Sequence, residues 1–76
     1  MKEYRTTNLY EASFLACRGF QFIGKERQGH KVEVIYNNSK LLTDAAIEFY
    51  NGGQVSAKAY ADWYRTLKDF VFSDRG

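Results

Sequence analysis

Hydrophobic and polar residues repeat along the chain with two different periods. Residues 8–18, 39–51 and 57–72 place apolar side chains every three or four positions, which predicts three helices. Residues 20–36 alternate apolar and polar side chains one by one, which predicts two antiparallel strands joined by a turn at Gly29. The predicted order is α-β-β-α-α. It indicates a small single-domain α+β fold, residues 1–76, with an antiparallel hairpin packed against three helices.

The first predicted helix has a signal at each end. Asn8 is a favourable N-cap, and Glu11 stands three residues later, where it can close a capping box. Gly19 follows the last turn, where glycine readily takes the left-handed conformation. Only Glu11 and Arg18 interrupt the apolar surface of this helix. We therefore expect it to pack on the hairpin and on a second helix, or to bind a partner.

The other two helices each have an apolar stripe. In residues 39–51 the stripe consists of Leu41, Leu42, Ala45, Ala46 and Phe49. In residues 57–72 it consists of Tyr60, Trp63, Tyr64, Leu67, Phe70 and Val71. The opposite face of this last helix carries three predicted ion pairs, Lys58–Asp62, Arg65–Asp69 and Asp62–Arg65. We interpret that charged face as solvated.

Strict alternation divides the hairpin into two faces. The face toward the helices is predicted to carry Phe20, Phe22, Val32, Val34 and Tyr36. The outer face is predicted to carry Gln21, Ile23, Lys25, Arg27, Lys31, Glu33 and Ile35. An isolated hairpin is marginal in water, so it needs helices on one face, and the sequence leaves open whether another strand also pairs along an edge. Residues 1–6, a bridge at Gln54–Val55 or a second copy of the protein could supply it, and residues 73–76 are expected to fray.

Aromatic residues are unusually frequent for so short a chain. There are 13 Phe, Tyr and Trp against 12 Ile, Leu and Val, and six of the rings are tyrosines. A tyrosine hydroxyl needs water or a hydrogen-bond partner, so half-exposed rings are expected. Two interpretations stay open: the rings fill a small core efficiently, or part of them contacts a partner.

Several functional classes are unsupported by the composition. No apolar run is long enough for a transmembrane helix or a secretory signal, so an intracellular protein without membrane contact is expected. One cysteine and one histidine exclude an internal disulfide and the common structural zinc sites. Cys17 lies on an apolar helix and His30 at the hairpin turn, which does not indicate a catalytic pair. We predict no enzyme activity, catalytic residue, metal, cofactor or small-molecule substrate.

The chain also resembles a known family of short domains of unknown function from bacteria, archaea, phages and other mobile elements. The likeness extends over nearly the whole chain and rests on these segments: residues 4–15 (YRTTNLYEASFL), Gly19-Phe20, residues 24–29 (GKERQG), residues 49–52 (FYNG), residues 55–58 (VSAK) and Leu67-Lys68. The resemblance implies the α-β-β-α-α order and a cytoplasmic location in a prokaryotic cell or a phage-infected host. It implies no activity or site residue.

Two kinds of partner remain. Residues 1–36 carry six basic and four acidic side chains, whereas residues 37–76 carry five of each, so the net charge of +2 belongs to the first half. A basic hairpin could contact nucleic acid, although strong binders neutralise about six or more phosphates. The excess of rings favours binding to a host protein or self-association as a homo-oligomer. We predict a stoichiometric protein-binding regulator or inhibitor. Its predicted contact residues are Ile23, Lys25, Arg27, His30, Lys31 and Ile35.

Overall fold

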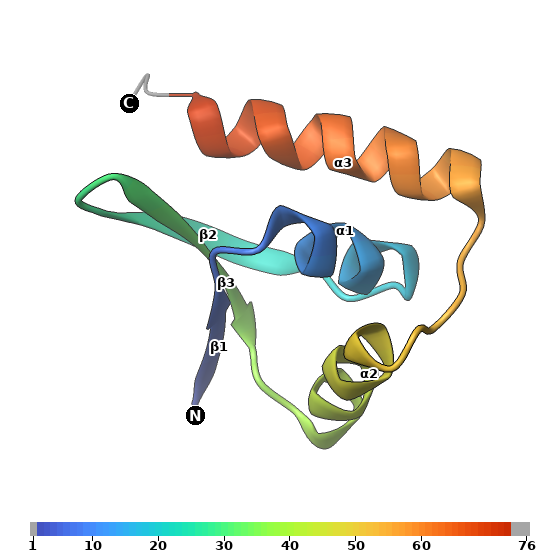
Figure 1. The fold of residues 1–76 in the computed structure, drawn as a ribbon. Helices are drawn as coiled ribbons and strands as arrows, with labels where there is room; N and C mark the ends of the chain where they lie inside the picture. The colour runs from blue at the N-terminus through green and yellow to red at the C-terminus, as the bar shows by residue number, and fades with distance from the viewer. Residues whose placement is uncertain (1, 74–76) are drawn as a thin grey trace.

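A computed structural model of the chain describes residues 2–73 (Figure 1). Its elements in chain order are β1 (Glu3–Thr6), α1 (Leu9–Cys17), β2 (Phe22–Gln28), β3 (Lys31–Asn37), α2 (Lys40–Tyr50) and α3 (Ala57–Phe72). The α+β class and the α-β-β-α-α order are confirmed, and β1 precedes that order. The predicted fraying at 74–76 lies outside the described residues.

The three strands form one antiparallel sheet in the order β1-β3-β2. The third strand is therefore β1, from the N-terminal segment, and residues 54–55 are not part of a strand. Because β1 pairs with the free edge of β3, β3 becomes the central strand. Val34 and Tyr36 of this strand are fully buried against the helices, as predicted.

A bulge in β2 reverses the predicted faces of this strand from Gly24 onward, while the faces of β3 are as predicted. The register shifts between Phe22 and Gly24, so that Lys25 pairs with Val34 and Arg27 pairs with Val32. Paired residues point to the same side of a sheet, so Lys25 and Arg27 lie on the helix side, where we had predicted the opposite. The prediction of the β2 faces was wrong because it assumed strict alternation, whereas one inserted residue moves every later side chain of the strand to the other face.

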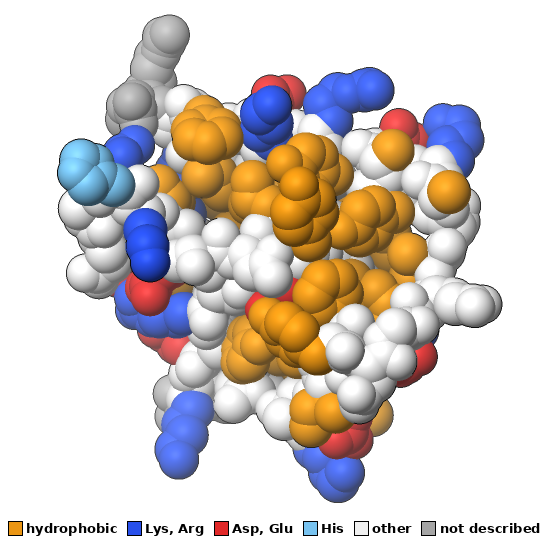
Figure 2. Space-filling view, viewed as in Figure 1, with side chains coloured by type: hydrophobic (Ala, Val, Ile, Leu, Met, Phe, Trp, Pro, Cys, Tyr) orange, Lys and Arg blue, Asp and Glu red, His pale blue; other side chains and the backbone are white. Residues whose placement is uncertain are grey.

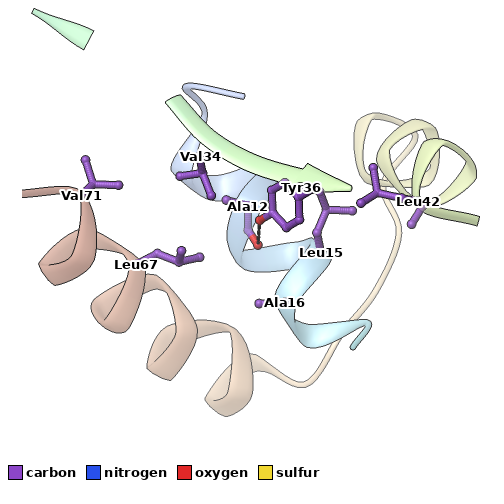
Figure 3. Packing of buried hydrophobic residues seen from close by; sticks show 9 residues of the cluster. Ala12, Leu15, Ala16, Val34, Tyr36, Leu42, Leu67 and Val71 are labelled. Carbon is purple, nitrogen blue, oxygen red and sulfur yellow. Dashed lines mark hydrogen bonds between the residues drawn. The ribbon is translucent and has the colours of Figure 1, made fainter. Parts of the chain in front are cut away.

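Helix α1 lies at the centre of the fold, between α3 and α2 (Figure 1). Its residues 11–16 are all buried. Figure 3 shows Ala12, Leu15 and Ala16 of α1 lying between Leu67 of α3 and Leu42 of α2. The core also includes Val34, Tyr36, Leu42, Leu67 and Val71. The Tyr36 hydroxyl donates to the Ala12 carbonyl at 3.3 Å, which ties the central strand to α1. Packing of α1 on the hairpin and on a second helix is thus confirmed.

Glu11 is 2% exposed and does not close the predicted capping box. Asn8 caps α1 as expected, because its side chain accepts from the Tyr10 and Glu11 amides, but the Asn8 amide donates to Thr6 Oγ1 instead. The Glu11 carboxylate accepts from the hydroxyls of Tyr4, Thr6 (2.7 Å) and Tyr50 (3.1 Å). Burial, and then the Glu11 carboxylate, raise the pKa of Tyr4. The prediction failed because these hydroxyls come from β1 and α2.

Arg18, directly after α1, is bound to α2. Its guanidinium donates to both carboxylate oxygens of Glu48, at 2.8 and 2.6 Å, and to the Gln54 carbonyl at 3.2 Å. It also lies 4.6 Å from the centre of the Phe14 ring. The hydrogen bonds from Arg18 lower the pKa of Glu48 and raise the pKa of Arg18.

This pair predicts an acid-dependent contribution to stability. A lowered folded-state pKa stabilises the fold above the unfolded pKa of Glu48, and that contribution is lost as pH falls below about 4.3. We expect Arg18→Gln to lower the urea midpoint more at pH 7 than at pH 3. Arg18→Gln also removes the contact between the guanidinium and the Phe14 ring, and this part of the destabilisation should be the same at pH 7 and pH 3. An equal difference between the two proteins at pH 7 and pH 3 would contradict a role for the ion pair.

Candidate functional site

The six predicted contact residues do not form one exposed surface. Lys25 lies on the helix side of the sheet, where its ammonium donates to the carbonyls of Phe70 and Ser73 at the end of α3. It is also 4.9 Å from the centre of the Phe70 ring. Because those carbonyls have no partner within the helix, Lys25 closes the C-terminus of α3. Lys25 is therefore held by contacts within the fold, and the prediction that it lies on the exposed face of the hairpin was wrong.

Ile35 points to the predicted outer face but is only 8% exposed. Its neighbours in the sheet are Arg5 on β1 and Gly24 on β2. The guanidinium of Arg5 reaches Glu26 on β2 at 2.6 Å, so this side chain crosses over the central strand. The prediction that Ile35 is exposed was wrong because β1 made its strand central. Ile23, at the bulge, is 53% exposed, as predicted.

The other three predicted residues meet at the tip of the hairpin. Arg27, His30 and Lys31 line a groove of about 270 Å³, which we call the hairpin groove. Its remaining lining consists of Thr7, Leu9, Val32, Val71 and Phe72. The groove therefore combines basic side chains from the hairpin with apolar side chains from α1 and α3. Three of the six predicted contact residues thus lie together, but they lie beside α3, which was not predicted from the sequence.

Hydrophobic side chains also gather over the face formed by α1, α2 and α3 (Figure 2). The large exposed hydrophobic residues are Tyr10, Ile23, Leu41, Ile47, Tyr50, Trp63 and Phe72. Leu41, predicted in the apolar stripe of α2, is 73% exposed, so that part of the stripe was wrong. Between α1 and α3 lies a second groove of about 460 Å³, the tyrosine groove. It is lined by Tyr10, Tyr60, Ala61, Tyr64, Arg65 and Lys68.

The tyrosine groove is held in a defined geometry. The rings of Tyr10 and Tyr64 stack with centroids 5.2 Å apart and planes 15° from parallel. The Tyr60 hydroxyl donates to the Tyr10 carbonyl at 3.2 Å, which fixes α3 against the start of α1. The neighbouring Tyr64 hydroxyl raises the pKa of Tyr10, while the positive charge of Lys68 opposes that rise. Three rings and a nearby ammonium thus share one surface.

The charges beside this groove are not neutralised as predicted. Lys58 and Asp62 form the expected i,i+4 pair at 3.1 Å. Within residues 2–73, however, Arg65 forms no ion pair with Asp62 or Asp69, and Lys68 forms none either. Of the three predicted ion pairs, only Lys58–Asp62 is therefore found within residues 2–73. The interpretation of this helix face as solvated is consistent with its charged residues, which are all exposed.

Other chemistry finds no support in the described residues. No group of three His, Cys, Asp or Glu side chains in residues 2–73 could hold a metal ion. Burial raises the pKa of the Cys17 thiol, although the adjacent Arg18 partly opposes this rise, so the reactive thiolate is disfavoured at neutral pH. None of the helices described is long and apolar enough to cross a membrane.

Sequence reasoning missed the tyrosine groove although it noted the excess of rings. The helical period places Tyr60 and Tyr64 in the apolar stripe and Arg65 on the opposite, solvated face. In the structure Arg65 is exposed, but it lines the same groove as the two half-buried tyrosines. The useful signal was that Tyr60, Tyr64 and Lys68 follow one another at four-residue spacing on one helix, with Arg65 next to Tyr64. Which of these side chains stay exposed depends on how α1 crosses α3, and no local pattern records that crossing.

Comparison with known proteins identified one family. The model of the family described as "Domain of unknown function (DUF5659)" matches residues 1–73. Searches of curated proteins and of solved structures found no match to the chain.

Proposed function

The chain belongs to the DUF5659 family of unknown function, and from its own surface we propose that it is a protein-binding module that acts without catalysis. The observation that carries this proposal is the tyrosine groove, where Tyr10 remains 57% exposed in a domain with few residues to bury. Tyrosine and arginine are enriched in protein interfaces, and both line this groove.

The mixed character of this surface supports a protein partner. All three helices contribute exposed apolar residues to this face. Single exposed apolar residues are normal on a protein surface, whereas a gathered set of them is typical of an interaction site. Stacked and hydrogen-bonded rings lose little conformational entropy on binding, so they suit a contact surface. A regulator or inhibitor that occupies a host protein stoichiometrically, in the cytoplasm of a prokaryotic or phage-infected cell, is the role we propose.

A nucleic-acid-binding accessory role is the second candidate. It is favoured by Arg27, His30 and Lys31, which line the hairpin groove together. Phosphate-led binding needs many cations on one face, however, and strong binders make about six to ten phosphate contacts. Several cations of this chain are already bound to its own carboxylates, among them Arg5 and Arg18.

The proposal can be tested by photo-crosslinking at two matched positions. A benzophenone-bearing amino acid would replace Tyr10 in one variant and Ile23 in another, since both side chains are exposed and apolar. We expect irradiation in a lysate of the organism that encodes the protein to give a discrete protein adduct from position 10 and none from position 23. The adduct would be measured by gel mobility and identified by mass spectrometry.

The other outcomes separate the alternatives. An adduct from position 23 alone would show that the partner binds the hairpin near Ile23, as the sequence predicted, and would contradict the proposal. A nuclease-sensitive adduct would favour the nucleic-acid role. An adduct with the mass of two chains would identify the protein partner as a second copy, which is the predicted homo-oligomer.

A further inference from the structure

We infer that the tyrosine groove and the hairpin groove form one continuous binding band, and that its ligand is an extended acidic segment of a partner protein with interspersed apolar side chains. This inference rests on the proposed function and specifies the chemistry of the partner. It places apolar side chains of the segment against the rings, and carboxylates against the cations along the band.

The two grooves adjoin along both helices that line them. Leu9 lines the hairpin groove and Tyr10, the next residue of α1, lines the tyrosine groove. On α3, Lys68 lines the tyrosine groove and Phe72, one turn later, lines the hairpin groove. The band therefore runs from the hairpin tip along the contact between α1 and α3. Figure 2 shows the hydrophobic side chains spread along this face.

The band holds positive charge that the described structure does not neutralise. Four cations elsewhere pair with a carboxylate at 2.6–3.1 Å: Arg5, Arg18, Lys40 and Lys58. Lys31, Arg65 and Lys68 form no ion pair with any residue between positions 2 and 73, and all three line the band. Asp69 follows Lys68 but pairs with none of them. The surface is therefore complementary to an anionic ligand.

The balance of charge and apolar area favours a peptide over a nucleic acid. Three available cations are fewer than the roughly six to ten phosphate contacts of strong nucleic-acid binders. Leu9, which is partly buried, and Phe72, which is 64% exposed, have side chains without hydrogen-bonding groups, and they suit apolar peptide side chains. An acidic peptide can place apolar side chains and carboxylates alternately, which matches the sequence of surfaces along the band.

The test uses a defined probe and a matched charge variant. The probe is a short fluorescein-labelled synthetic peptide in which Glu alternates with Leu and Tyr, followed by fluorescence anisotropy. Its controls carry Lys in place of Glu, or Ser in place of Leu and Tyr, and an oligothymidylate of similar length is measured in parallel. Arg65→Gln with Lys68→Gln removes charge from the band, whereas Lys40→Gln removes an exposed charge from α2, outside the band.

We expect the acidic apolar peptide to bind the full chain, with both control peptides weaker. The double variant should lose about tenfold in affinity, while Lys40→Gln should stay within about twofold of the original chain. Far-UV circular dichroism checks that both variants fold. Equal affinities of the double variant and Lys40→Gln, or tighter binding of oligothymidylate than of the peptide, would overturn the inference. Absence of any peptide binding also overturns it, yet leaves the crosslink from position 10 as a separate test of the proposed function.

Discussion

Replacing Glu11 by alanine is expected to destabilise this protein more than any other single exposed or polar change. The carboxylate accepts hydroxyl hydrogens from Tyr4, Thr6 and Tyr50, and so joins β1, α1 and α2 at one point. Its removal leaves the buried hydroxyl of Thr6 and the part-buried hydroxyl of Tyr4 without this acceptor, at about 1–3 kcal/mol for each unsatisfied group. The lost side-chain packing adds to that loss.

The total stability of a 76-residue domain sets the scale of this effect. Typical domains have about 0.05–0.15 kcal/mol of unfolding free energy per residue, which gives roughly 4–11 kcal/mol here. A loss of about 3–5 kcal/mol from Glu11→Ala is therefore a large part of the total stability, and at the lower end of the stability range it would unfold a large share of the molecules. Urea unfolding followed by circular dichroism measures the change. A loss below about 1 kcal/mol would show that the hydroxyls find other partners.

Glu11→Gln is the matched control for that experiment. It keeps the size of the side chain and one carbonyl oxygen as acceptor, while it replaces the second acceptor by a donor. We expect Glu11→Gln to lower the free energy of unfolding, but by less than Glu11→Ala lowers it. A glutamine variant as unstable as the alanine variant would indicate that two acceptor oxygens are required, and that filling the position is not sufficient to stabilise the cluster.

Replacing Gly53 by alanine is the second change with a large expected effect. A Cβ atom at this position would lie 2.8 Å from Phe14 Cζ and 2.8 Å from Glu48 Cγ. Phe14 is buried and packs on Phe49, and both carboxylate oxygens of Glu48 are held by Arg18, so neither neighbour can move freely. Overpacking of this kind costs about 1–3 kcal/mol.

Gly24→Ala is the matched control for Gly53→Ala. No atom lies within 4 Å of a Cβ built at Gly24, and its backbone does not have a positive φ. Alanine there should be neutral or should stabilise by up to about 1 kcal/mol, since it restricts the unfolded chain. The comparison is made by thermal and urea unfolding of both variants. Equal effects of the two substitutions would contradict a packing origin of the loss at Gly53.

Local signals predicted the elements of this fold because each depends on neighbouring residues only. Asn8, Ser39 and Ser56 cap their helices through side-chain oxygens that accept the amides of the first turn. Gly29 takes a positive φ of 63° at the hairpin turn. A cap or a tight turn is satisfied within a few residues of the chain, so the sequence around it carries the information.

The candidate site was harder to predict because it depends on contacts between distant residues. Lys25 and Ile35 left the predicted contact surface when the bulge in β2 and the added strand β1 changed their neighbours. Tyr10 and Tyr64 meet only because α1 and α3 cross, and they lie 54 positions apart in the chain. Only the basic tip, with Arg27, His30 and Lys31, kept its predicted grouping.

The sequence by itself determined the periodicity, the caps, the turns and the α+β class, since those features follow from backbone preferences and from which positions are apolar. The tertiary structure alone decided that Glu11 is a buried acceptor, that Lys25 closes α3, and that Arg65 and Lys68 lack an ion-pair partner among residues 2–73. The physical reason is the same in each case. A polar or charged side chain takes the partner that the packed elements bring to it, and that partner lies far away in the chain.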